Sequence, residues 1–174
     1  MKSTKTFLFI TIALSCFMIS CREAEPIDNK VDEAVAAEAE REVVAELWMT
    51  DFEAAKVKAK AENKPMLLDF TGSDWCGWCI KLDKEVFGEA AFKDYAAAEL
   101  VLVELDFPDP KGQLAKGQSA QLKAQNEALA KQYGVRGVPT ILLLSPDGEL
   151  IEKTTYQPGG PEAYVEHIKG ILAK

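Results

Sequence analysis

Residues 66–79, MLLDFTGSDWCGWC, hold the most informative pattern of the chain. The first five residues form a short apolar run, which is typical of a buried strand. Two cysteines three positions apart, Cys76 and Cys79, follow at the expected start of a helix that runs to about residue 87. Residues three apart share one face of a helix, so the two sulfurs can come within bonding distance.

The position of Cys76 favours thiolate chemistry. At the start of a helix, the first sulfur lies beside unpaired backbone N–H groups and the positive end of the helix dipole. This environment lowers the pKa of a thiol, and the thiolate is the nucleophile of disulfide exchange. We therefore interpret Cys76 as the attacking cysteine and Cys79 as the cysteine that resolves the mixed disulfide.

Two other interpretations of the cysteine pair have less support. A structural zinc site needs four ligands, but the chain has no second pair of this spacing, and its one histidine, His167, lies near the C-terminus. A static disulfide is possible outside the cytoplasm, although a disulfide that closes so small a loop adds little stability. We expect no metal site and no cofactor.

Helical and strand patterns alternate along the rest of the chain. Residues 50–53, TDFE, have the form of a capping box, which predicts a helix with Thr50 as its N-cap that ends before Pro65. Further strands are predicted at residues 100–105, 140–144 and 149–155, further helices at residues 90–97 and 119–133 and up to about residue 172, and a polar loop at residues 108–117. Strands separated by helices, with a hairpin near the end, predict an α/β fold in which helices flank a mixed central sheet.

Two separate motifs of the chain resemble the thioredoxin family. Residues 75–79, WCGWC, resemble the family's W-C-G-P-C, and residues 131–140, KQYGVRGVPT, closely resemble the segment that ends in its cis-proline. The resemblance covers about residues 47–174 and is especially close to secreted and periplasmic relatives of the C-terminal domain of the disulfide reductase DsbD. It implies a thioredoxin-like fold in which a cis-Pro loop lies beside the helix that carries the cysteine pair.

The resemblance also implies contacts with an extended client segment. Pro139 matches the proline whose preceding peptide bond is cis, and the backbone of Val138 is expected to pair with the client. Trp75, Gly77 and Trp78 lie beside or between the cysteines and are expected to contact the client too. Without the resemblance, Pro139 is simply the residue before a strand, and Trp75 is an ordinary core aromatic residue.

Asp69 matches the buried aspartate that handles the proton of the resolving cysteine in this family. A carboxylate within an apolar strand is costly unless it is paired or protonated, so we expect a raised pKa and a general-base role. Two departures from the family bear on this role. Seven residues separate Asp69 from Cys76, one more than in thioredoxin, and Leu102 stands where the partner lysine is expected.

The predicted reaction is thiol–disulfide exchange with protein clients, after which a redox partner protein resets the pair. The dipeptide between the cysteines, Gly77-Trp78, supplies no cation to stabilise a thiolate. We therefore expect a reductase or isomerase rather than a strong oxidant. The alternative is a thioredoxin-fold binding module, or a metal-handling lipoprotein, in which redox chemistry regulates binding.

Residues 1–20 are predicted to be a signal peptide of the lipoprotein type. Two lysines precede an apolar run at residues 7–19, which is shorter than the roughly 20 residues that span a membrane. Residues 18–21, MISC, resemble a lipobox and predict lipidation of Cys21. Cys16, which follows Ala-Leu-Ser, could serve instead but leaves a shorter apolar run. Ordinary secretion with cleavage near Ser20, or an uncleaved anchor, is also consistent with the run. We expect an extracytoplasmic protein of the bacterial cell envelope, anchored by lipid with the outer membrane favoured, or else secreted.

Residues 21–46 are predicted to be an acidic tether in front of the domain at residues 47–174. Residues 22–46 hold nine acidic and three basic residues, a net charge of −6, and both a short amphipathic helix and a solvated spacer are consistent with this segment. The whole chain carries a formal charge of −8, which disfavours binding to nucleic acid or to an anionic membrane surface. We expect a monomer that meets the membrane only through its lipid.

Overall fold

The computed structural model describes residues 47–174 of the chain. The predicted signal peptide, the lipidation site at Cys21 and the acidic tether lie outside the described residues. Within the described range, no helix combines the length and the apolar character needed to cross a membrane.

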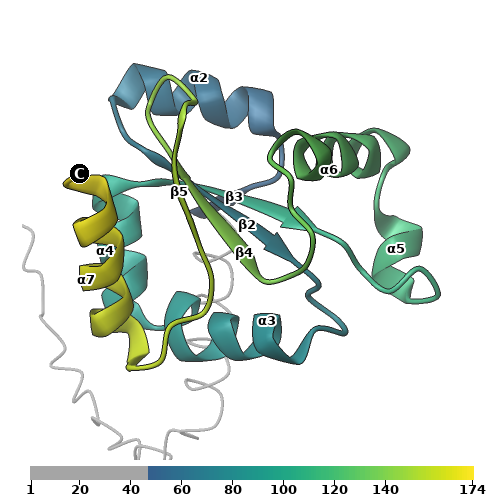
Figure 1. The fold of residues 1–174 in the computed structure, drawn as a ribbon. Helices are drawn as coiled ribbons and strands as arrows, with labels where there is room; N and C mark the ends of the chain where they lie inside the picture. Colours follow the sequence, from purple (N-terminus) through teal and green to yellow (C-terminus); the bar gives the residue numbers. More distant parts are fainter. Residues whose placement is uncertain (1–46) are drawn as a thin grey trace, which may run out of the picture.

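A mixed sheet of five strands lies at the centre of the described residues (Figure 1). The strand order is β1-β3-β2-β4-β5. The first three of these run parallel to one another, whereas β4 is antiparallel to both of its neighbours, β2 and β5. The strands are β1 (Trp48–Met49), β2 (Met66–Thr71), β3 (Val101–Asp106), β4 (Thr140–Leu144) and β5 (Leu150–Thr154). The cysteine pair thus follows the middle strand, β2.

Helices cover both faces of this sheet. The helical segments are α2 (Phe52–Glu62), α3 (Gly77–Leu82), the π-helical turn η1 (Asp83–Phe87), α4 (Ala90–Glu99), α5 (Gln113–Gly117), α6 (Ala120–Gln132) and α7 (Gly160–Leu172). One face packs against α3, η1, α4 and α7, and the other face packs against α2 and α6 (Figure 1). Each face therefore has its own hydrophobic core.

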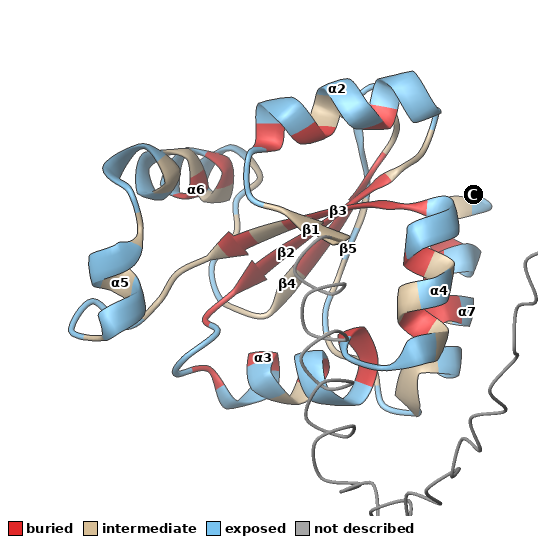
Figure 2. Cartoon of the chain, turned by 180° about the vertical axis from the view of Figure 1, so that it is seen from behind, coloured by how far each residue is buried: buried red, intermediate tan, exposed pale blue. Residues whose placement is uncertain are grey.

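The side chains of β2 alternate between these two cores, as the pleat of a strand requires. Met66, Leu68 and Phe70 belong to the core under α2 and α6, whereas Leu67 belongs to the core under α4 and α7. All six residues of β2 are buried, and Figure 2 shows the central strands as the most buried part of the chain. Because Asp69 is two residues after Leu67, its carboxyl group lies on the α3 side of the sheet.

The predicted α/β fold is confirmed, and every predicted strand and helix is present with small shifts of its bounds. The sequence does not predict two of the observed elements. β1 has only two residues, which is too short for an alternating pattern to be recognised. α5 lies within the predicted loop at residues 108–117, and because it has no buried residue and no side-chain cap, its sequence carries no helical signature.

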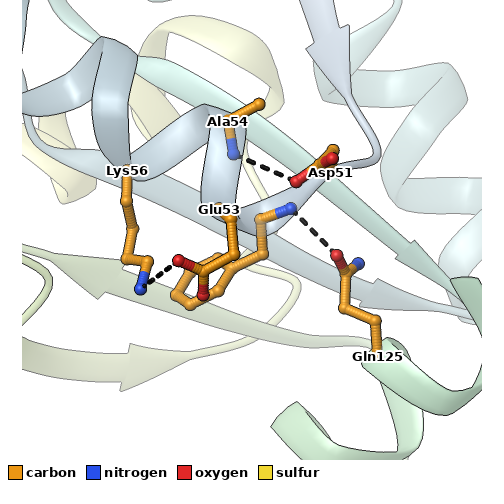
Figure 3. Close-up of polar contacts among 6 residues, drawn as sticks. Asp51, Glu53, Ala54, Lys56 and Gln125 are labelled. Carbon is orange, nitrogen blue, oxygen red and sulfur yellow. Dashed lines mark hydrogen bonds and ion pairs between the residues drawn. The ribbon is translucent and has the colours of Figure 1, made fainter. Parts of the chain in front are cut away.

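The predicted N-cap of α2 is wrong by one residue. Asp51, not Thr50, caps the helix, because its Oδ1 accepts a hydrogen bond of 3.0 Å from the backbone N–H of Ala54 (Figure 3). A second free donor at this helix end, the backbone N–H of Phe52, donates a hydrogen bond of 3.1 Å to the side-chain oxygen of Gln125 in α6. The expected reciprocal bond from Glu53 does not form, since its carboxylate pairs with Lys56 at 2.8 Å (Figure 3).

We expect Asp51→Ala to lower the free energy of unfolding by about 1 kcal/mol, the usual loss when an N-cap acceptor is removed. Thr50→Ala is the matched control, and we expect it to change stability by less than about 0.5 kcal/mol because an exposed side chain is removed. Urea denaturation of the three proteins measures both effects. A larger loss of unfolding free energy in Thr50→Ala than in Asp51→Ala would show that Thr50 is the N-cap.

Candidate redox site

Cys76 and Cys79 form a disulfide at the start of α3, with their Cα atoms 5.2 Å apart. Cys76 is the N-cap of the helix, and its sulfur accepts a hydrogen bond of 3.2 Å from the backbone N–H of Cys79. Both side chains are buried, Cys76 at 7% and Cys79 at 3% exposure. When the pair is reduced, the same N–H group can stabilise a thiolate on the first sulfur.

The cis-Pro loop lies directly beside the first sulfur. The Val138–Pro139 peptide bond is cis, and the carbonyl oxygen of Val138 is 3.7 Å from the sulfur of Cys76. The hydroxyl of Thr155 donates to the carbonyl oxygen of Pro139 at 2.9 Å, which ties the loop to the segment after β5. The structure therefore brings together two motifs that are far apart in the sequence, as the resemblance implies.

Two exposed tryptophans flank the cysteine pair. Trp75 is 56% exposed and Trp78 is 59% exposed. Trp75 is therefore not an ordinary core aromatic residue, which is the alternative interpretation of its position in the sequence. The indole N–H of Trp75 donates to the carbonyl oxygen of Phe107 at 2.7 Å. Its ring also lies over Gly72, where an added Cβ would approach the indole to 2.6 Å. Trp75 thus has a fixed position beside the pair.

Trp78 is held from the other side by residues that the sequence does not single out. Its ring centroid is 5.4 Å from that of Tyr156, and the Nζ of Lys81 lies 5.2 Å from the same ring. Gly77 lies on the open side of α3, since a Cβ added there would meet no atom within 4 Å. The surface around the pair is therefore aromatic and sterically open.

Asp106, at the end of β3, anchors the loop that precedes the pair. Its carboxylate accepts hydrogen bonds from the backbone N–H and the hydroxyl of Ser73, at 2.9 and 2.8 Å. Its carbonyl oxygen accepts from the side-chain amides of Gln118 and Asn126, each at 3.0 Å. Asp74 is exposed, and its carboxylate accepts a hydrogen bond of 2.9 Å from the backbone N–H of Asp109. The sequence shows Asp106 only as the end of a strand.

Asp69 lies next to the second cysteine, inside the protein. It lines a cavity of about 110 Å³ together with Cys79, and its Oδ1 is buried without a hydrogen-bond partner. Burial raises the pKa of Asp69 well above its usual 3.8, and the nearby carboxylates of Glu104 and Asp83 raise this pKa further. Leu102 is packed in the hydrophobic core, so the side chain at this position brings no positive charge to Asp69.

Glu104 and Asp83 are the two acidic residues of this cavity that the sequence analysis misses. Glu104 interrupts the apolar residues of β3 and is the register partner of Asp69. An acidic residue in an otherwise apolar strand is a usable signal, as it is for Asp69. Its placement opposite Asp69 depends on the register between β2 and β3, which a single sequence does not specify.

Comparisons with known proteins identify the family of the chain. A family model described as "Thioredoxin-like domain" matches residues 52–168. The chain is 34% identical over 128 residues to the disulfide bond reductase DsbH of Chlamydia pneumoniae, and the match covers 74% of each chain. A solved structure of a DsbH oxidoreductase superposes with a TM-score of 0.66 at 34% identity, covering 72% of this chain and 83% of that one.

Two longer relatives match over part of their length. The thioredoxin-related protein DsbJ of Chlamydia pneumoniae is 30% identical over 113 residues, covering 65% of this chain and 30% of that protein. The thiol:disulfide interchange protein DsbD of Actinobacillus pleuropneumoniae is 24% identical over 148 residues, covering 85% of this chain and 22% of that protein. The chain therefore spans less than a third of the length of either of them.

We expect the oxidised protein to lose stability as the pH rises. The folded state holds a proton on Asp69 at pH values where the unfolded state has lost it, because the pKa of Asp69 is raised by folding. The contribution of Asp69 to the free energy of unfolding is therefore greatest below the ordinary carboxyl pKa and falls through the window up to the raised value, by as much as about 1.4 kcal/mol per pH unit.

Asp69→Asn should make this fall shallower, and urea denaturation of the disulfide-bonded protein between pH 4 and pH 9 measures it. Asp94→Asn, at an exposed position of α4, is the control and should keep the slope of the parent. Equal slopes in all three proteins would show that folding does not raise the pKa of Asp69.

Proposed function

The chain belongs to the thioredoxin-like family, and we propose that it reduces or isomerises disulfides of extracytoplasmic client proteins through Cys76 and Cys79. It is a thiol–disulfide oxidoreductase. One observation carries the proposal: the disulfide between Cys76 and Cys79 lies at the start of α3, with the Cys76 sulfur 3.7 Å from the Val138 carbonyl oxygen of the cis-Pro loop. A nucleophilic sulfur at that point lies beside backbone that can bind an extended client.

The proposed reaction has two exchange steps. The Cys76 thiolate attacks one sulfur of the client disulfide, so a bond forms between Cys76 and the client, and the other client sulfur leaves as a thiolate. Cys79 then loses its proton to Asp69, attacks the Cys76 sulfur and expels the second client thiolate. Two electrons pass to the client, and the pair ends as a disulfide. A dithiol redox partner protein reverses these steps on the pair.

The residues around the pair support a role in client binding. The carbonyl oxygen of Val138 faces the sulfur at which the client must arrive, and Pro139 shapes the backbone there. Trp75 and Trp78 present more than half of their surface to solvent on either side of the pair. Aromatic side chains of this kind supply large contact areas at protein interfaces. We assign client contacts to these four residues and to Gly77, whose missing side chain leaves room between the rings.

The direction of electron flow is proposed from two findings. DsbH, which shares 34% identity with the chain, is a disulfide bond reductase by name. The pair itself has no histidine between its cysteines to stabilise a thiolate strongly, so it lacks one device that favours an oxidant. Reduction or isomerisation of client disulfides fits both findings.

We propose that the protein works outside the cytoplasm as a lipid-anchored monomer. The signal-like residues 1–20 and the lipobox-like sequence before Cys21 support this location. If Cys21 carries lipid and residues 1–20 are removed, Cys76 and Cys79 are the remaining cysteines. This arrangement would protect the pair from wrong disulfides with other cysteines of the same chain. The acidic residues 22–46 would then hold the domain away from a membrane of like charge.

We expect the protein to accelerate the reduction of insulin disulfides by dithiothreitol, and Cys76→Ser to lower the rate to that of dithiothreitol alone. The serine hydroxyl cannot replace the attacking thiolate. Insulin turbidity measures the rate. An intact protein that is no faster than its Cys76→Ser variant would rule out the proposed function.

Cys79→Ala serves as the partner variant because it separates the roles of the two cysteines. Without the resolving sulfur, the bond between Cys76 and the client should persist, and mass spectrometry should detect clients bound through Cys76. If the bound client were released as quickly as from the parent, Cys79 would not be the resolving cysteine.

We expect radioactive palmitate to label the protein in its bacterial host and Cys21→Ala to abolish the label. The lipid is attached to this cysteine in the proposed anchor, so its removal should also release the protein from the membrane fraction. Cys16→Ala is the matched control and should keep the label. If the parent protein took up no label, the proposed lipid anchor would be wrong.

A further inference from the structure

The cavity behind the redox pair gathers carboxyl groups from three elements. Asp69 of β2, Glu104 of β3 and Asp83 of η1 line the same space of about 110 Å³ as Cys79. Asp69 and Glu104 are register partners on neighbouring parallel strands, so their side chains leave the same face of the sheet about 5 Å apart at the backbone. Both therefore face the second cysteine from the core side.

The two strand carboxyls differ in their access to water. Asp69 is only 7% exposed, and its Oδ1 has no hydrogen-bond partner. Glu104 is half-buried and lines the same cavity. Glu104 is therefore better placed than Asp69 to exchange a proton with bulk solvent. The hydroxyl residues Thr71 and Ser73 also line the cavity and can orient water within it.

The charges around the two carboxyls are almost all negative. Asp83 and Asp106 act on both Asp69 and Glu104, and the phenol of Tyr164 on α7 faces Asp69. The positive charge of Lys93 on α4 acts on Asp83 and lowers its pKa. Two carboxyls that share a small cavity do not ionise together easily, and their protons leave in steps that belong to the pair.

We propose that Glu104 is a proton-relay residue of the redox reaction, which exchanges protons with solvent and passes them to and from Asp69, so that the two carboxyls together store one proton beside Cys79. This inference rests on the proposed function of the cysteine pair. Glu104 acts through Asp69 and does not touch the reacting sulfurs. Within residues 47–174, no group of three His, Cys, Asp or Glu side chains is arranged to hold a metal ion.

The relay balances in both directions. When a client is reduced, the proton of the Cys79 thiol moves to Asp69, then to Glu104 and to solvent, while the Cys79 sulfur bonds to Cys76. When a dithiol partner protein reduces the pair, two electrons break the Cys76–Cys79 bond and the partner becomes a disulfide. Cys76 leaves as a thiolate, and a proton taken up from solvent by Glu104 passes through Asp69 to the Cys79 sulfur, so the same path runs in reverse and Asp69 can again accept the Cys79 proton in the next client reduction.

The test is a titration of the side-chain carboxyl carbons of Asp69 and Glu104 by ¹³C NMR on the intact, disulfide-bonded protein. We expect Asp69 in the parent protein to titrate in two steps, one of them shared with Glu104. In Glu104→Gln, a single step should remain, shifted to lower pH by about one unit or more, because the negative neighbour is gone. Glu104→Asp, which keeps the carboxyl group, should restore the two steps.

A kinetic measurement on the same variants tests the relay in action. The rate at which Cys79 resolves a preformed mixed disulfide between Cys76 and a client peptide should have a pH midpoint that moves down in Glu104→Gln together with the NMR shift. The KM for the client should stay unchanged. Glu99→Gln, on α4 beside Pro65 at the opposite end of β2, is the matched control and should move neither the titration nor the midpoint.

Two results would overturn the relay. One is a single titration step for Asp69 in the parent protein with no shared step at Glu104, which requires no variant to fold. The other is a Glu104→Gln variant whose Asp69 titration and pH midpoint match those of the parent. In either case, the proposed function would stand if the parent protein still reduced insulin. A failure of the proposed function would appear in a different experiment, as equal insulin reduction by the parent and by Cys76→Ser.

Discussion

The hydrogen bond from the Cys79 backbone N–H to the Cys76 sulfur is the interaction on which the site depends. Because the Cys76 sulfur caps α3, the sulfur is held beside the free backbone N–H groups of the first helical turn. The middle strand, β2, delivers the chain to this point, and β4 begins directly after the cis-Pro loop. The sheet thus brings the proposed nucleophile and the backbone proposed to bind the client to the same end of the sheet.

The cysteine pair and most elements could be predicted because they depend on local patterns, whereas the cis-Pro loop is predicted through the resemblance to the thioredoxin family. Cys76 and Cys79 are defined by their spacing, and β2 by an apolar run with one carboxylate. Features that depend on tertiary contacts could not be predicted. Asp51 replaces Thr50 as a cap because it reaches the Ala54 N–H, and β1 exists only because β3 offers it a partner edge.

The interior behind the pair shows the same division. That Asp69 is buried follows from its strand, and its raised pKa follows from burial. Which residue of β3 lies opposite Asp69 depends on the register between β2 and β3. This register places Glu104, and not Leu102, beside Asp69. Leu102 instead joins the hydrophobic core. At the position where the resemblance predicts a lysine, this chain has the apolar Leu102, and the carboxyl opposite Asp69 comes from Glu104, two residues further along the same strand.

Asp106 gives the region a property that matters for protein engineering. Its carboxylate holds Ser73 in front of the cysteines, while its carbonyl oxygen holds Gln118 and Asn126 of the segment beyond β3. One residue thereby links two loops that are separate in the chain. If the loop before the cysteines were replaced by a loop from another protein, the new loop would lack the hydrogen bonds that Ser73 makes with Asp106. Shortening residues 108–118 would disturb the contacts that position Asp106 and would leave the new loop less well held. The two segments form one module and should be exchanged together.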